Sequence, residues 1–179
     1  MIIGKKCTLR PLEFDDLDML RSWSNDEEIL NLLGGWHFPV SIREHEAWFN
    51  SITNDFQNRR FAIDVEGRFV GTTNLVSINW KDRNAFHGIM LGDKSVRGQG
   101  IGQEVVNLIM KYSFSELGLN RLDSDIISYN SASIRLYTEK CGWEIEGRQK
   151  DWYFRNNSWH DRILIGVTST RYFQKVSAG

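Results

Sequence analysis

A glycine-rich stretch between an apolar run and a helical pattern is the first feature of the sequence that could do chemistry. Gly98, Gly100 and Gly102 alternate along it, and Arg97 stands directly before them. Glycine has no Cβ atom, so the backbone there can take positive φ values and come close to a ligand. The unpaired N–H groups and the dipole at the start of the following helix favour an anion, and the arginine adds a positive charge. We interpret the stretch as a pyrophosphate-binding loop.

Two common nucleotide-binding motifs do not match this loop. A dinucleotide fingerprint needs a third glycine where Gln103 stands. A P-loop needs Gly-x-x-x-x-Gly-Lys-Ser/Thr, and the sequence contains no such string. The alternative left open is a flexible strand–helix connection that binds no ligand.

A second group of residues follows a predicted strand that ends near Ile127. Asn130 can cap a helix, and Ser133 and Tyr137 lie four residues apart on one face of it. On its position alone, Tyr137 is most simply an ordinary packed tyrosine of an amphipathic helix.

Both groups resemble motifs of one family, the GNAT superfamily of acetyl-CoA-dependent N-acetyltransferases. Val96–Gly102 resembles its Arg/Gln-x-x-Gly-x-Gly/Ala motif, and Asn130–Trp143 resembles its Asn-x-x-Ala/Ser-x-x-x-Tyr pattern with a following Gly–aromatic pair. The resemblance covers nearly the whole chain. It implies an α/β fold of the GNAT type, in which a mixed central sheet of about six to seven strands is splayed at the acetyl-CoA site and flanked by helices. It also implies a single N-acetyltransferase domain over residues 1–179.

The resemblance implies roles for individual residues. The loop amides would hold the coenzyme A pyrophosphate, Asn130 would contact the pantetheine arm, and Tyr137 would face the thioester sulfur. A phenol with a pKa of about 10 stays protonated at neutral pH and can donate a proton to the leaving thiolate, so Tyr137 is the candidate general acid. A backbone N–H near Met90 would meet the oxyanion. The residues expected to bind acetyl-CoA are Met90, Leu91, Arg97, Gly98, Gln99, Gly100, Ile101, Gly102, Asn130 and Ser133. We expect no metal, because His and Cys do not cluster at ligand spacing.

The general base is less well defined by the sequence. Many relatives place a glutamate where this chain has Phe86. His87 is the nearest titratable residue and is the candidate base. The alternatives are that His87 is a packed, hydrogen-bonded histidine, that water relays the proton, or that the amine arrives already neutral.

The acceptor site is expected to be aromatic. Seven tryptophans and five tyrosines are more than a core of this size needs, so some should line a pocket. The candidates for substrate contact are Trp36, Phe38, Trp80 and Trp152.

Further strings resemble one branch of the family, which contains ribosomal-protein, spermidine and amino-sugar acetyltransferases. Glu44-His45-x-x-Trp48-Phe49 and Gly71-x-x-Asn74-Leu75 look closest to the amino-sugar enzymes. The leading hypothesis is direct acetyl transfer to a primary amine of a small molecule, with a nucleotide-linked amino sugar as the favoured acceptor. The alternatives are a protein N-terminal or polyamine acetyltransferase and, from another class, a non-catalytic acetyl-CoA-binding regulatory module.

Composition restricts the partners. The chain has 179 residues, a net charge of −1 and 25% charged residues, which gives no footprint for nucleic acid or an anionic membrane. No apolar run approaches the ~18 residues of a membrane span. Only two cysteines are present, which fits a reducing cytoplasm, and we expect a monomer or homodimer.

The order of the predicted elements supports a mixed α/β fold. One strand and a helical region come first, with Ser41 and Glu44 forming a capping box. A meander of strands, the strand–loop–helix unit, a strand–helix unit and two closing strands follow. The predicted strands cover residues 7–12, 61–65, 69–78, 86–92, 121–127, 143–149 and 163–168, with a turn at 156–158 between the last two.

Overall fold

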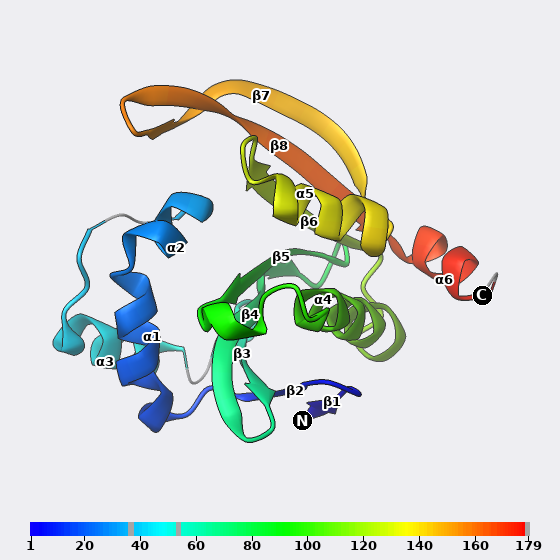
Figure 1. The fold of residues 1–179 in the computed structure, drawn as a ribbon. Coiled ribbons are helices and arrows are strands. Elements are labelled where there is room, and N and C mark those ends of the chain that lie inside the picture. The colour runs from blue at the N-terminus through cyan, green and yellow to red at the C-terminus, as the bar shows by residue number, and fades with distance from the viewer. Residues whose placement is uncertain (36–37, 53–54, 178–179) are drawn as a thin grey trace.

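The computed structural model describes residues 1–35, 38–52 and 55–177, and it contains one twisted sheet flanked by helices (Figure 1). The strands are Ile2–Ile3 (β1), Thr8–Pro11 (β2), Arg59–Val65 (β3), Arg68–Asn79 (β4), Asn84–Leu91 (β5), Arg121–Ile127 (β6), Glu144–Arg155 (β7) and Ser158–Thr168 (β8). They lie in the order β1-β2-β3-β4-β5-β6-β8-β7. The eight strands exceed the expected six to seven, because the short strand β1 adds an edge that the sequence did not reveal.

The sheet opens between β5 and β6. These two strands run parallel, whereas the other neighbours are antiparallel. Their pairing covers only Asn84–Phe86 with Arg121–Asp123, although β5 continues to Leu91 and β6 to Ile127. The backbone groups on the facing edges beyond Phe86 therefore have no ladder partner across the gap. This is the splay that the family resemblance implied.

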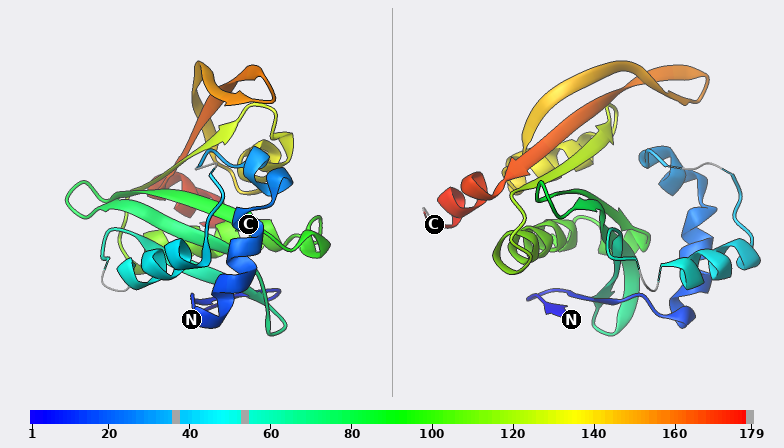
Figure 2. Two further views of the ribbon diagram at one scale, coloured as in Figure 1. Left: turned by 90° about the vertical axis from the view of Figure 1, so that its left-hand side faces the viewer. Right: turned by 180° about the vertical axis from the view of Figure 1, so that it is seen from behind.

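Helices cover both sides of the opening. Their bounds are Leu17–Ser24 (α1), Glu27–Leu32 (α2), Ile42–Ser51 (α3), Ile101–Lys111 (α4), Ser131–Arg135 (α5) and Ser169–Ser177 (α6). Figures 1 and 2 show α1–α3 and α4 on opposite sides of the central strands. The α4 side packs on the larger apolar cluster, and the α1–α3 side packs on a second cluster around Leu20, Trp23 and Ile29. The predicted capping box at α3 is confirmed, since Ser41 Oγ accepts from Glu44 N and Glu44 Oε2 accepts from Ser41 N.

The glycine loop connects β5 to α4 as expected, with one correction. Gly98 and Gly100 have φ values of 76° and 82°, in the left-handed region. Gly102 lies inside α4 instead and does not need positive φ. A Cβ atom at Gly102 would lie 3.3 Å from Leu136 Cδ2, so glycine there allows the segment after α5 to pack close to α4.

The last two strands form an arm that is longer than predicted. β7 and β8 contain 12 and 11 residues, and Figure 1 shows them reaching past the rest of the sheet towards α2. The predicted turn between them is confirmed, with Asn156 and Asn157 at φ values of 48° and 58°. A register shift between Gln149 and Tyr153 interrupts the alternation of inward and outward side chains along β7. The sequence pattern there is polar and irregular, so the outer half of β7 was not predicted. Helix α6 was also missed.

Candidate active site

A large cavity lies where the sheet opens. Its volume is about 1430 Å³, above the range of roughly 300–1,000 Å³ that is usual for one small ligand. It is lined by α1–α3, by β4 and β5, by the glycine loop, by β6 and by the segment from Asn130 to Lys140. A cavity of this size, lined by elements from both sides of the sheet, has room for a long carrier molecule and a second substrate.

The loop side of the cavity fits a diphosphate. Arg97, Gly98, Gly100 and Gly102 line it, and α4 begins at Ile101. A Cβ atom added at Gly100 would lie 3.0 Å from Lys6 Nζ, so the backbone there is bare and beside a cation. Open backbone amides at a helix start and nearby positive charge are what a phosphate group requires.

Two of the predicted loop residues do not face the cavity. Gln99 donates from Nε2 to Ser95 O at 2.7 Å, and Ile101 is 3% exposed in the apolar core. Any contact of these residues with a ligand would have to come from their backbone.

Arg97 is bonded to other groups of the protein. Its guanidinium lies 2.8 Å from Glu28 Oε1 and donates to Leu91 O at 3.3 Å. The same carboxylate pairs with Lys94 at 2.6 Å. Arg97 was expected to add a positive charge for a phosphate, and its pairing with Glu28 was not foreseen. Arg135 and Lys140, which also line the cavity, were missed. Their place on the helical segment that begins at Asn130 was the available signal.

Asn130 connects two helices across the site. Its Oδ1 accepts from Ser133 N at 3.1 Å, which confirms the predicted helix cap, and its Nδ2 donates to Leu32 O at 3.2 Å beside the end of α2. Both ends of the side chain are therefore bonded within the protein. Asn130 and Ser133 line the cavity, and their contact with pantetheine stays a prediction.

Tyr137 borders the cavity from within the larger apolar cluster. It follows α5 in a π-helical turn, Leu136–Lys140, of the kind that often marks functional sites. The side chain is 2% exposed yet lines the cavity. Its hydroxyl oxygen is 2.9 Å from His87 Nδ1, and burial raises the pKa of Tyr137 well above its ordinary value. The phenol therefore stays protonated at physiological pH.

His87 does not have the surroundings expected of a general base. Its side chain is 0% exposed, it does not line the cavity, and burial lowers its pKa to about 3. Nε2 lies 3.0 Å from Thr73 Oγ1. Along β5 it is Phe86 and Gly88 that border the cavity, whereas His87 packs against Trp143. The alternative of a packed, hydrogen-bonded histidine describes what is observed.

The buried imidazole should make the fold sensitive to acid. Its folded pKa of about 3 is below the unfolded value of about 6.5, so only the unfolded chain takes up the proton as pH falls between these values. The contribution of His87 to the free energy of unfolding is fully present above pH ~6.5 and is lost progressively towards pH ~3. The loss between pH 7 and pH 5 is roughly 2 kcal/mol. Urea unfolding at both pH values should show this loss in the wild type and a smaller loss in His87→Gln. An equal loss in both proteins would contradict the assignment.

The edge of β5 beyond Phe86 borders the cavity without a strand partner from β6. Met90 and Leu91 line the cavity, and β6 does not pair with β5 beyond Phe86. Alternate N–H groups on that edge thus lack a strand partner. A backbone donor near Met90 remains the prediction for the oxyanion site.

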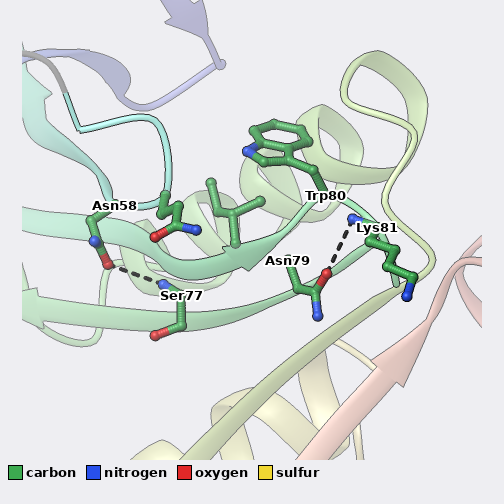
Figure 3. Close-up of a pocket in the computed structure, with 7 residues that line it drawn as sticks. Asn58, Ser77, Asn79, Trp80 and Lys81 are labelled. Atoms are coloured by element: carbon green, nitrogen blue, oxygen red, sulfur yellow. Dashed lines mark hydrogen bonds between the residues drawn. The ribbon is translucent and has the colours of Figure 1, made fainter.

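The aromatic residues predicted to contact the substrate differ in whether they line the cavity. Trp152 lines the cavity, and the Arg162 guanidinium lies 4.9 Å from its ring centroid. Phe38 is 64% exposed and does not line the cavity. Trp80 borders a separate hollow at the end of β4 (Figure 3). Its Nε1 donates to Phe56 O at 3.3 Å. Trp36 lies outside the described residues.

Trp80 was misplaced because the sequence does not reveal which end of the β4–β5 hairpin faces the opening. Other aromatic and polar residues, from α3, β3 and β4, do line the cavity. They are Glu44, His45, Trp48, Arg60 and Asn74. Within residues 1–35, 38–52 and 55–177 there is no cluster of His, Cys, Asp and Glu suited to a metal ion.

A sheet that opens beside a glycine loop at a helix start, with a buried phenol at the opening, fits a transferase whose acyl donor carries a diphosphate. Residues 6–144 match the family model described as acetyltransferase (GNAT) domain, so the chain belongs to this family. It is an acetyl-CoA-dependent N-acetyltransferase, and the alternative of a non-catalytic binding module is not retained. The residues on the loop side of the cavity fit the diphosphate of that substrate.

The relatives include polyamine enzymes. Spermidine N(1)-acetyltransferase of Vibrio cholerae is 26% identical over 176 residues, which covers 97% of this chain and 99% of that protein. The enzyme of the same name from Escherichia coli is 26% identical over 92% of this chain and 87% of its own length. The crystal structure of the Vibrio cholerae spermidine N-acetyltransferase in complex with CoA and spermine has a TM-score of 0.88, with 26% identity over 95% of this chain and 99% of that chain.

These comparisons correct the branch assignment. The expected closeness to ribosomal-protein and amino-sugar acetyltransferases is not supported, because the named relatives with an assigned small-molecule acceptor act on spermidine. The strings around Trp48 and Asn74 were too short to separate members that share a fold and a cofactor. Among the described residues, no helix has the length and apolar character that crossing a bilayer requires.

Proposed function

We propose that the chain transfers the acetyl group of acetyl-CoA to a primary amine of a polyamine such as spermidine. The observation that carries this proposal is the match, over nearly the full length of both chains, to a spermidine acetyltransferase solved with CoA and spermine. The polyamine alternative thereby replaces the nucleotide-linked amino sugar as the leading acceptor.

The wall of the cavity formed by α3, β3 and β4, which we take as the acceptor side, contains groups that suit an ammonium ion. Glu44 lines it, and the hydrogen bond with Ser41 holds the pKa of that carboxyl below its ordinary value, so it is ionised at neutral pH. Trp48 and Trp152 supply aromatic faces, which attract cations. Asp125 also lines the cavity, although Arg162 neutralises it with an N–O distance of 2.9 Å.

The amine must attack as a neutral nucleophile. Phe86 occupies the cavity-lining position where many relatives have a glutamate, and His87 is enclosed. We propose that the amine loses its proton to water and not to a side chain. The rate should then rise with pH along a limb set by the amine, and this limb should persist in His87→Gln. A limb that disappears in that variant would restore His87 as the base.

Free thiol release from acetyl-CoA, measured with a panel of amines, tests the acceptor class. Spermidine and spermine should give turnover with one thiol per acetylated product, confirmed by mass spectrometry. A nucleotide-linked amino sugar and a short peptide should give much lower kcat/KM. Efficient turnover of either one, with none on the polyamines, would overturn the proposal.

A single domain over residues 1–179, a cytoplasmic location and a monomer or homodimer stay predictions.

A further inference from the structure

A buried chain of hydrogen-bonding side chains connects β4 with Tyr137. Thr73 Oγ1 is 3.0 Å from His87 Nε2, and His87 Nδ1 is 2.9 Å from the Tyr137 hydroxyl. Thr73 and His87 are 0% exposed and Tyr137 is 2% exposed. The Trp143 ring contacts both the imidazole and the phenol, with centroid distances of 5.9 and 4.9 Å. Thr73 and Tyr137 border the cavity at the two ends of the chain, whereas His87 between them does not.

The distances between the heavy atoms fit two arrangements of the protons along this series of hydrogen bonds, which run in opposite directions. Thr73 Oγ1 donates to Gly88 O at 2.9 Å, and the same hydroxyl can instead turn to His87 Nε2, which lies at 3.0 Å. If the threonine proton goes to that carbonyl, His87 carries its proton on Nε2, and Tyr137 must donate to Nδ1. If the threonine proton goes to Nε2, His87 carries its proton on Nδ1 and donates to the Tyr137 oxygen. A neutral imidazole has one donor and one acceptor, so the threonine determines which nitrogen is the donor.

Only the second direction leaves Tyr137 able to act as an acid. In the first direction the single phenol proton is held by His87, and a phenolate would face the lone pair of Nδ1. In the second direction the phenol proton is free to point into the cavity, and a phenolate would receive the Nδ1–H bond. Burial keeps the imidazole neutral in both, so the difference is one of tautomer and not of charge.

We propose that Thr73 and His87 are positioning residues that orient the Tyr137 proton towards the leaving sulfur, through the order Thr73 O–H to His87 Nε2 and His87 Nδ1–H to the Tyr137 oxygen. The inference depends on Tyr137 acting as the acid, and it does not depend on which amine is acetylated.

The proposed step transfers the acetyl group from sulfur to nitrogen and moves one proton at each of these two atoms. The amine nitrogen forms a bond to the acetyl carbon, and the bond from that carbon to sulfur breaks. The sulfur leaves with the bonding electron pair and takes the proton of Tyr137. The nitrogen releases its surplus proton to solvent, and Tyr137 regains a proton from solvent through the cavity. His87 keeps its proton throughout and contributes one hydrogen bond to the phenolate.

Ser124 offers a competing donor. It lies on β6, lines the cavity and is close enough to lower the pKa of Tyr137, although burial has the larger, opposite effect. If Ser124 alone supported the phenolate, removing the Thr73 hydroxyl would leave kcat unchanged. Variants at Thr73 therefore separate the two arrangements.

The first test removes and restores the threonine hydroxyl. Thr73→Val should lower kcat about tenfold, near the upper effect of one hydrogen bond, while the KM for acetyl-CoA stays within about twofold. Thr73→Ser should recover most of the loss. Ser113→Ala is the matched control, because Ser113 is also 0% exposed and its hydroxyl has no hydrogen-bond partner within the described part of the chain. Wild-type kcat in Thr73→Val, or equal losses in Thr73→Val and Thr73→Ser, would overturn the proposal.

The second test reads the tautomer directly and does not require the variants at Thr73 to fold. Protein labelled with ¹⁵N-histidine carries four histidines, and His87→Gln assigns the buried one. Long-range ¹H–¹⁵N spectra with acetyl-CoA bound and no amine present should show a proton on Nδ1 of His87. A proton on Nε2 in that complex would refute the proposed direction. Because no amine is needed, this outcome is independent of whether spermidine proves to be the acceptor.

Discussion

Tyr137→Phe should lower kcat by about 10²–10⁴-fold while acetyl-CoA binding is retained. The substitution removes only the hydroxyl, which is the group placed between His87 and the cavity. The ring stays packed against Trp143, so the shape of the cavity is preserved. Steady-state kinetics with spermidine and calorimetric titration with coenzyme A measure the two quantities separately.

Tyr172→Phe is the matched control for that variant. Tyr172 is a partly buried tyrosine on α6 that packs against Phe114 and does not line the cavity. Its loss of a hydroxyl should leave kcat unchanged. If Tyr137→Phe also turned over at the wild-type rate, Tyr137 would have no part in the chemistry, whatever its position in the structure.

Gly100→Val should weaken acetyl-CoA binding by roughly ten- to thirtyfold. Gly100 has a φ value of 82°, where a side chain costs about 1–2 kcal/mol, and a branched side chain is the least tolerant. The loop can relieve that strain only by shifting, which moves the amides away from the phosphates. The measurement is the KM for acetyl-CoA together with the Kd for coenzyme A.

The β3–β4 hairpin provides a control with equal backbone strain. Gly67 has a φ value of 79°, and a Cβ atom there would meet nothing within 4 Å. Gly67→Val should therefore lower the melting temperature without changing the KM for acetyl-CoA. A similar rise of KM in both variants would show that the effect of Gly100→Val is general destabilisation and not loss of the phosphate site.

Local patterns were sufficient to predict the parts of the fold that depend on them. The capping box at Ser41, the turn at Asn156–Asn157 and the cap at Asn130 each involve groups close in sequence, and each was confirmed. The strand–loop–helix unit was predicted for the same reason. Gly102 was misread because a helical glycine needed for close packing against Leu136 has the same sequence signal as one with positive φ.

The site depended more on long-range contacts. The Glu28 partner of Arg97 is 69 residues away, and the Tyr137 partner of His87 is 50 residues away, so neither pairing has a local signature. Residue type alone therefore suggested a phosphate-binding arginine and a histidine that acts as a base. The structure shows a paired arginine and an enclosed imidazole whose pKa is about 3.

The acceptor side was the least predictable part. Its residues come from α3, β3 and β4, and the face each one occupies depends on strand register. Trp80 and Phe38 were chosen as aromatic residues near predicted loops, but proximity in sequence does not place a side chain at the opening of a sheet. Arg60 and Asn74 are direct partners in the β3–β4 ladder, which no single stretch of sequence could reveal.

A crystal structure with coenzyme A and spermidine would test the proposed arrangement as a whole. We expect the diphosphate to contact backbone amides between Arg97 and Gly102, and the sulfur to lie within hydrogen-bonding distance of the Tyr137 hydroxyl. We also expect an amine of spermidine to lie beside Gly88 on the acceptor side. A nucleotide bound elsewhere, or a Tyr137 hydroxyl remote from the sulfur, would contradict the arrangement.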